Sequence, residues 1–148
     1  MYWNAEAYFK ASQEHLNEAW SFFYSDTGNH NLYAHYWAGI AIECMLRAYQ
    51  LQDSKEWEGR HDLLQLFQSG FEKKVSKRSA VKTSTLLTEV ARRWNSNHRY
   101  ATPEMLVASL HSKRVDVQLK GDPLRNNARR MLGCAQHIVT LGAERWRK

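Results

Sequence analysis

Two pairs of side chains in the second half of the sequence could perform acid–base chemistry on a phosphate. Arg93 and His98 are separated by four residues, and Arg130 and His137 by six. A histidine with a near-neutral pKa can move the proton of a ribose hydroxyl, and an arginine can hold a phosphate as charge develops on it. Two helical turns would place Arg130 and His137 about 10 Å apart, so one chain could not easily aim both at the same phosphate.

A second group of residues could bind a ligand. Glu43 and Arg47 lie four residues apart in an apolar stretch, so they form either a structural salt bridge or the wall of a polar groove. Arg99 and Tyr100 belong to a cationic cluster with aromatic residues, which suits the phosphate and the base of a nucleotide. His61 is either the cap of a short helix, a partner of Glu43, or a further ligand-binding residue.

The sequence does not indicate a metal or cofactor site. Its seven histidines lack the spacing of zinc ligands on a helix, and no glycine-rich phosphate loop occurs. Cys44 and Cys134 stand alone in apolar segments, which predicts buried free thiols. We therefore expect chemistry or binding by side chains alone.

Apolar residues recur at helical spacing in most of the chain, and no strand pattern of useful length occurs. The segment 32–51 has only two charges, which predicts a central helix, and Gly39 within it predicts the close approach of another backbone. We interpret 53–60 as a linker and 71–80 as a basic loop. The sequence predicts an all-α, up-and-down bundle of five to six helices in one domain, 1–148. The predicted helices are 3–25, 32–51, 61–69, 81–95, 102–119 and a last one starting at 123.

Three motifs in this order resemble the HEPN domain family. Residues 41–48, Ala-Ile-Glu-Cys-Met-Leu-Arg-Ala, are similar to the A-[VI]-E-x-x-L-[KR]-A helix of that family. Residues 61–64 resemble its H-x-L segment, and residues 99–104 resemble its R-Y element before the next helix. The resemblance implies a HEPN-like helical bundle, commonly a homodimer. It also implies nucleotide binding, a nucleotidyltransferase partner protein, or metal-independent RNA cleavage in toxin–antitoxin and defence systems.

The catalytic branch of that family carries an arginine, four to six residues, and a histidine near the start of the last helix. Arg93 and His98 have this spacing but precede the R-Y element, and Ala101 stands where a proline often follows it. We therefore expect first a non-catalytic module that binds a nucleotide or RNA phosphate. The alternatives are a metal-independent ribonuclease that uses Arg93 and His98, and an antitoxin-like protein-binding partner without nucleic-acid contact. The residues of the expected ligand groove are Glu43, Arg47, His61, Arg99 and Tyr100.

Charge is distributed unevenly along the 148 residues, whose net charge is +6. Residues 1–72 carry 4 basic and 10 acidic side chains, whereas residues 73–99 carry 8 basic and 1 acidic. If this asymmetry persists in space, the basic side would attract phosphate or an acidic protein.

Composition narrows the class of protein. Apolar residues make up 43% and charged residues 24%, which is typical of a globular domain, and charges interrupt each apolar stretch that could cross a membrane. The first residues show no signal-peptide pattern, so we expect a cytoplasmic protein. The aromatic residues concentrated in the first 37 positions predict a helix-to-helix dimer face.

Overall fold

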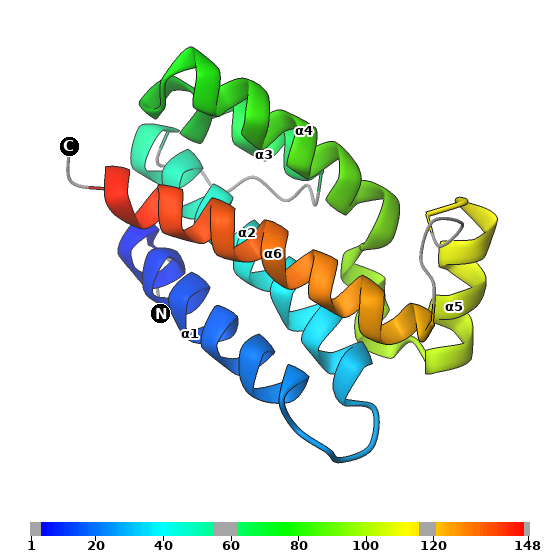
Figure 1. Cartoon of the computed structure of the whole chain (residues 1–148). Coiled ribbons are helices and arrows are strands. Elements are labelled where there is room, and N and C mark those ends of the chain that lie inside the picture. The colour runs from blue at the N-terminus through cyan, green and yellow to red at the C-terminus, as the bar shows by residue number, and fades with distance from the viewer. Residues whose placement is uncertain (1–3, 55–61, 116–120, 147–148) are drawn as a thin grey trace.

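The computed structural model describes residues 4–54, 62–115 and 121–146. These residues form six α-helices and two 3-10 helices, and none of them belongs to a strand, which confirms the predicted all-α class (Figure 1). The α-helices are α1 (Ala5–Phe23), α2 (His30–Ser54), α3 (Leu63–Gln68), α4 (Lys77–Arg93), α5 (Pro103–Ser112) and α6 (Pro123–Arg145). The 3-10 helices are η1 (Phe71–Lys74) and η2 (Ser96–Tyr100).

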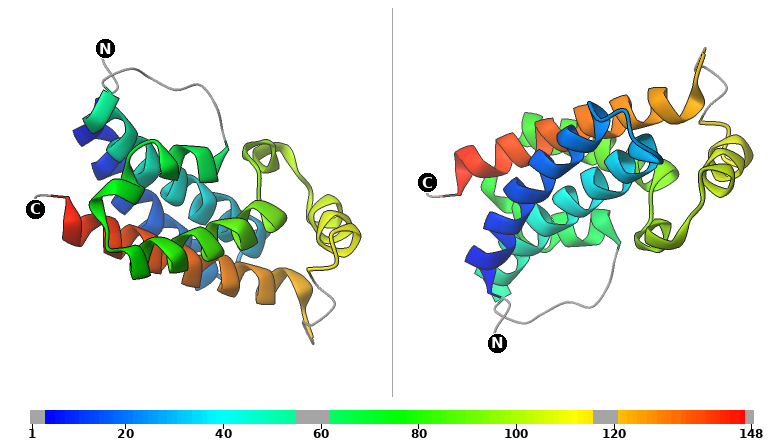
Figure 2. Two further views of the ribbon diagram at one scale, coloured as in Figure 1. Left: turned by 90° about the horizontal axis from the view of Figure 1, so that it is seen from above. Right: turned by 90° about the horizontal axis from the view of Figure 1, so that it is seen from below.

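Helix α2 is the centre of the bundle, as its nearly uncharged sequence predicted. Every residue from 41 to 51 is buried, and α1, α3 and α6 all pack against this helix. Hydrogen bonds join His35 to Asn127 and Tyr49 to Gly142, so α6 runs parallel to α2. Helix α6 lies over α2 with α1 on one side and α4 on the other, whereas α5 lies at one end of the bundle (Figures 1 and 2).

Side-chain oxygens fix where the helices begin. The Thr102 hydroxyl accepts from the N–H of Met105, and the Asp122 carboxylate accepts from the N–H of Leu124, as expected for a capping residue followed by proline. Asp62 caps α3 in the same way. His61, the candidate cap in the sequence, lies outside the described residues.

Several boundaries differ from the sequence prediction; for example, α2 continues to Ser54, into the segment 53–60 that was expected to be a linker. The basic loop expected over 71–80 instead contains η1 and the first turn of α4, whose hydroxyl cap is Ser76. The cations of the first turn of α4 are exposed, so this turn lacks the apolar periodicity from which a helix is predicted. It is helical because it extends a helix whose later turns are stabilised by packing. Helix α5 ends at Ser112 rather than near 119. The short helix η2 was not predicted, because 3-10 turns have no hydrophobic period to detect.

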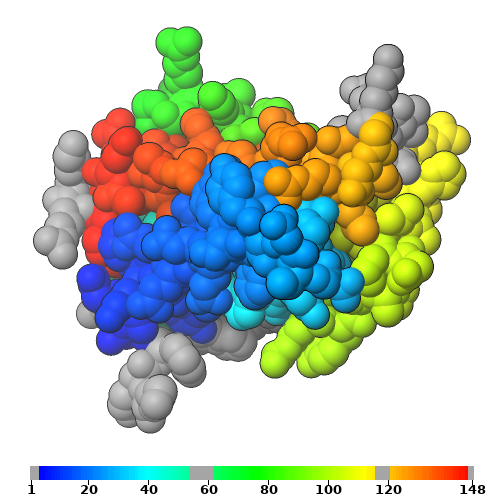
Figure 3. Space-filling model, turned by 60° about the horizontal axis from the view of Figure 1, so that its bottom comes forward, coloured from blue at the N-terminus to red at the C-terminus, as the bar shows by residue number. Residues whose placement is uncertain are grey.

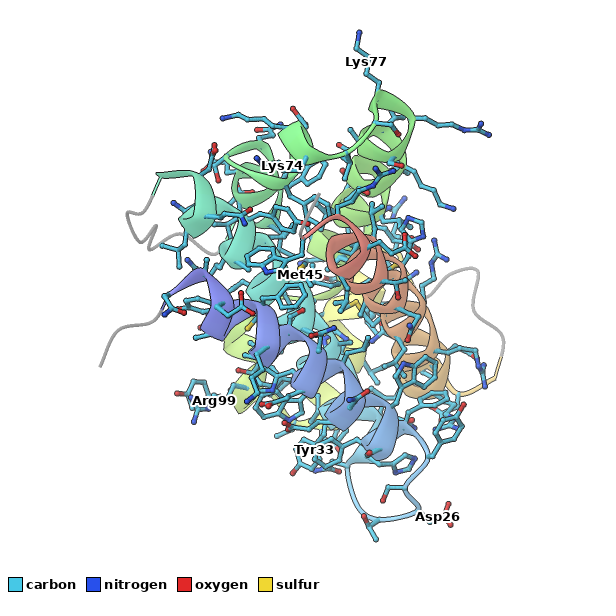
Figure 4. All side chains as sticks on the ribbon, turned by 90° about the vertical axis from the view of Figure 1, so that its left-hand side faces the viewer. Asp26, Tyr33, Met45, Lys74, Lys77 and Arg99 are labelled. Carbon is cyan, nitrogen blue, oxygen red and sulfur yellow. The ribbon has the colours of Figure 1, made fainter. Side chains whose placement is uncertain are left out.

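Two glycines allow other residues to approach the central helix. A Cβ on Gly39 would lie 2.0 Å from Cε2 of the Trp94 indole, so the predicted close approach is real, but a side chain makes it rather than a backbone. A Cβ on Gly142 would lie 2.5 Å from the sulfur of Met45, which sits in the middle of the bundle (Figure 4). These contacts explain glycine inside two helices, where it is otherwise destabilising.

Most described aromatic side chains of the first 37 positions pack onto the core instead of forming a free face. Trp20, for example, is partly buried and donates from Nε1 to Gln136 Oε1 at 2.9 Å, which joins α1 to α6. The space-filling view shows these two helices side by side (Figure 3). Tyr24 and Tyr33 are the exposed exceptions, at 72% and 44%.

Candidate functional site

A chain of hydrogen bonds connects the predicted catalytic pair inside the bundle. Arg93 donates from Nη1 to Asn127 Oδ1 at 3.1 Å, and Asn127 Nδ2 lies 2.8 Å from His35 Nδ1. His35 Nε2 in turn lies 2.9 Å from His98 Nδ1. The four buried side chains come from α4, α6, α2 and η2. The fold therefore joins Arg93 to His98 through two residues that the sequence analysis did not select.

The direction of each hydrogen bond follows from the two ends of this network, where the Arg93 guanidinium and the backbone N–H of Asn95 can only donate. A guanidinium can only donate, so Asn127 accepts with its oxygen and donates with its nitrogen to His35 Nδ1. His35 then carries its hydrogen on Nε2 and donates to His98 Nδ1, which also faces the backbone N–H of Asn95 at 3.4 Å. His35 is satisfied at both nitrogens as a neutral ring, and a proton added to Nδ1 of either histidine would meet a donor instead of an acceptor.

The electrostatics of the chain agree with neutral histidines. Burial lowers the pKa of His35 well below its ordinary value, and the neighbouring His98 and Arg93 lower this pKa further. Burial also lowers the pKa of His98, with Lys113 as a second cause. Both rings are therefore uncharged near pH 7.

Glu89 lies at the Arg93 end of the hydrogen-bond network. Arg93 donates from Nη2 to Glu89 Oε1 at 3.1 Å, and Arg130 donates from Nε to the same oxygen at 2.8 Å. The hydrogen bond from Arg130 is the main reason that the pKa of Glu89 is lowered. Arg130 is thus an ion-pair partner of Glu89, while the alternative histidine, His137, lies on α6 near Lys82.

The turn that carries His98 presents a cation and an aromatic ring to the surface. Tyr100 is 77% exposed, and the Arg99 guanidinium carbon lies 5.8 Å from the centroid of its ring. Arg99 lies at the edge of the molecule in Figure 4. The exposed Arg92 donates from Nη2 to the carbonyl oxygen of Lys113 at 2.8 Å, and Lys113 is close enough to His98 to lower its pKa. We call these four residues, Arg92, Arg99, Tyr100 and Lys113, the η2 surface.

The other predicted pair, Glu43 and Arg47, is a buried ion pair. Arg47 donates from Nε to Glu43 Oε2 at 3.1 Å, and the two residues are 2% and 8% exposed, Arg47 being the less exposed. The pKa of the half-buried Tyr36 is raised, mainly by burial; Arg99 opposes this rise and Glu43 adds to it. Glu43 and Arg99 therefore both influence the same phenol.

The structure brings together some of the predicted site residues. Arg93 joins His98 through the buried chain, and Arg99 and Tyr100 lie just outside it; Glu43 and Arg47 lie further along α2, and His61 is outside the described residues. Sequence reasoning missed His35, Asn127, Glu89 and Tyr36 as members of this site. A signal existed for Asn127, because it is a polar residue three positions after Leu124 on the apolar face of α6.

The rest of the described chain offers no competing metal centre. Within residues 4–54, 62–115 and 121–146, no three His, Cys, Asp or Glu side chains are placed to hold a metal ion. No helix in those same ranges has the length and hydropathy that crossing a membrane requires. Cys44 and Cys134 are free and buried, as predicted, and burial raises the pKa of the Cys44 thiol to about 12.

Comparison with known proteins adds no relative. No family model matches the chain, no curated protein matches it, and no solved structure matches it. The fold and the site define an all-α bundle with a buried polar chain beneath a cationic, aromatic turn. The resemblance to HEPN domains stays a prediction.

Proposed function

We propose that the chain is a non-catalytic module that binds the phosphate of a nucleotide or of RNA at the η2 surface. One observation carries the proposal: Arg99 and Tyr100 are exposed side by side on a turn that buried His98 holds in place. A cation meets a phosphate, and an open aromatic ring accepts a stacked base. The proposal agrees with the family resemblance, in which such modules work alone or with a nucleotidyltransferase partner.

The charge around the turn supports an anionic ligand. Residues 90–100 contain three arginines and no acidic residue, and Lys113 adds a further cation close enough to lower the pKa of His98. Glu89, just before this stretch, is already paired with Arg93 and Arg130, and the next acid after it is a single exposed carboxylate, Glu104. Positive charge at the η2 surface is therefore left for a ligand.

The buried groups have a supporting role in this proposal. His98 is a positioning residue, because its bond to His35 fixes the turn that carries Arg99 and Tyr100. Glu43 and Arg47 are too buried to meet a bulky ligand directly, so we propose that they shape the wall behind Tyr36.

The ribonuclease alternative has one observation in its favour and one against it. Arg93 and His98 share one hydrogen-bonded chain, and His98 is neutral, as a general base requires. However, both side chains are more than nine-tenths buried and bonded to internal partners. Cleavage of RNA in EDTA that is lost in His98→Gln and retained in Arg99→Glu would favour the ribonuclease over the binding module.

The binding proposal can be tested with a fluorescent uridine oligonucleotide and with ATP. Tyr100→Ala removes the stacking ring, so we expect a loss of about tenfold in affinity, since stacking on an aromatic ring contributes about 1–3 kcal/mol. Arg99→Glu should weaken binding further and reduce its salt dependence. The matched control is Lys10→Glu with Tyr24→Ala, an exposed cation and an exposed tyrosine on α1 and just after it.

Two results would contradict the proposal. One is unchanged affinity in the Arg99→Glu, Tyr100→Ala double variant. The other is an equal loss in the control variant, which would mean that net charge rather than this surface binds the ligand. If the chain binds neither probe but binds a purified acidic protein, the antitoxin-like alternative is favoured.

A further inference from the structure

Helix α5 is held at the end of the bundle by a small apolar cluster of its own (Figure 1). Within the described chain, the buried members of this cluster are Leu106 and Leu110 of α5 and Leu32 of α2. We call these three residues the end cluster. The main core is separate from it and is built from α1, α2, α3, α4, α6 and η1. Because so few buried side chains hold α5, this helix can leave its place at a lower cost in free energy than the others.

Two features beside the end cluster also make the packing of α5 less stable. A hollow of about 470 Å³ lies between α5 and the first turn of α6, lined by Pro103, Val107 and Leu124 among others, so α5 does not fill the space beside α6. Arg114, just after the end of α5, has a φ of 58°. This left-handed conformation is disfavoured for a residue with a side chain, and glycine is usual at this position after a helix.

The end cluster lies directly against the buried hydrogen-bond network. Leu32 is three residues before His35, on the same side of α2. Leu124, which packs against the cluster, is likewise three residues before Asn127 on α6. The helices that supply His35 and Asn127 therefore carry the network and the cluster on consecutive turns.

The turn that carries His98 reaches the same cluster. Ala101 packs against the cluster and donates its backbone N–H to the carbonyl oxygen of His98 at 3.1 Å. Lys113, at the far end of α5, is close enough to His98 to lower its pKa. Three of the four residues of the network thus lie within one turn of a residue that belongs to the end cluster or packs against it, so α5 covers this end of the network.

We propose that α5 is a lid over the buried network. It moves away from α2 and α6 as one unit, and His35 and His98 then meet solvent while the main core stays folded. Ala101 and Thr102 connect α5 to η2 in an extended conformation, so they can absorb this movement. In the closed state Arg93 and His98 are more than nine-tenths buried, so acid–base chemistry by these two residues requires the open state. The lid does not depend on phosphate binding at the η2 surface.

Chemical modification of the histidines measures the opening directly. Diethyl pyrocarbonate acylates an unprotonated imidazole, and both His35 and His98 are neutral near about pH 7. Without urea, the two rings of the natural chain should be modified more slowly than N-acetylhistidine, by the fraction of molecules that are open. Peptide mass spectrometry identifies each modified histidine, and tryptophan fluorescence in urea follows unfolding of the main core. If His35 and His98 react only where the core unfolds, the lid is refuted.

Removal of one leucine from the end cluster should open the lid more often. Leu110 is fully buried, and replacing a buried leucine by alanine shifts such an equilibrium about 30-fold or more. Leu110→Ala should therefore raise the modification rate of His98 by that factor. The matched control is Leu132→Ala, which removes an equally buried leucine from the main core. It should lower the urea midpoint and leave the rate at His98 unchanged, and equal rates in the two variants would contradict the proposal.

Arg114 allows a test in the opposite direction that keeps the end cluster intact. Arg114→Gly relieves the left-handed strain, so it should make opening about fivefold rarer and slow the modification of His98 by the same factor. Arg114→Ala is the control, since it removes the same charge and keeps the strain, and it should leave the rate unchanged. A rate that falls equally in both variants, or in neither, would overturn the lid.

Amide hydrogen exchange separates a lid from a helix that only frays. The amides of Leu106 and Leu110 should exchange through the same opening that exposes His98, at least about 100-fold faster than the amide of buried Leu46 in α2. Leu110→Ala should accelerate the exchange at Leu106 and the modification of His98 by the same factor. If the amides of α5 exchange rapidly while His35 and His98 stay unmodified, α5 frays without uncovering the network and the proposal is wrong.

Discussion

The buried pair of histidines makes the stability of this protein depend on pH in a predictable direction. The folded state keeps His35 neutral, because burial lowers its pKa, whereas the unfolded chain protonates it below about pH 6.5. The unfolded state therefore binds more protons, so stability rises with pH. The contribution of His35 is complete above about pH 6.5 and is lost as the pH falls below that value.

The size of this effect follows from linkage. Each pH unit below about 6.5 costs about 1.4 kcal/mol for every histidine that stays neutral in the folded protein. His35 alone should lower the free energy of unfolding by about 1.4 kcal/mol between about pH 7.5 and about pH 5.5, and His98 should add to this loss. Above about pH 5.5 most carboxylates stay ionised, so Glu89 does not disturb the comparison.

His35→Gln is the informative substitution, because glutamine can accept from Asn127 and donate to His98 but cannot be protonated in this range. Urea unfolding at several pH values should show that this variant loses the His35 share of the pH dependence while it stays folded at neutral pH. His30→Gln is the matched control, since His30 is half-buried in the first turn of α2 and outside the hydrogen-bond chain. If the natural protein and the His35→Gln variant lost stability equally on acidification, the interpretation of His35 as a buried neutral ring with one donor and one acceptor nitrogen would be refuted.

Three further substitutions test the packing by urea unfolding. Gly39→Ala should destabilise the fold by about 3 kcal/mol, because the new methyl group overlaps the buried Trp94 indole. Arg47→Met removes the guanidinium that donates to the buried Glu43 carboxylate and should cost about 3–5 kcal/mol, and adding Glu43→Leu should recover part of that loss; no recovery would contradict the ion-pair account. Gly133→Ala should stabilise the fold by about 0.8–1.0 kcal/mol, since this position is exposed and a methyl group meets no neighbour there.

Hydrophobic periodicity was sufficient to predict the class of fold and most of the helices. The apolar residues of 32–51 identified the central helix because burial on every side leaves few charges in a sequence. The helix caps Thr102 and Asp122 could also be predicted, since capping depends on the type of the capping residue. The first turn of α4 was missed, because exposed cations there give no periodic signal.

Only part of the candidate site could be predicted from the sequence, because the residues that bond to one another there are far apart in the sequence. The spacing of Arg93 and His98 is local and could be recognised, but the residues between them in space, His35 and Asn127, belong to other helices. The sequence also treated Glu43 and Arg47 as possible groove residues, and only the packing of α2 shows how deeply they are buried. Tyr36 could not be predicted as a member of the site, because nothing in the sequence around it indicates that Arg99 is close to it in the fold.

The four residues of the buried hydrogen-bond network are far apart in the sequence, and this has a consequence for the order of folding. Its three links join residues 34, 63 and 92 positions apart, so each closes a long loop. The entropic cost of those closures must be met before any link forms, and no single helix hairpin contains all four groups. The His35 Nε2 hydrogen should therefore be protected from exchange only in molecules that have completed folding, which makes its NMR signal a reporter of the last step.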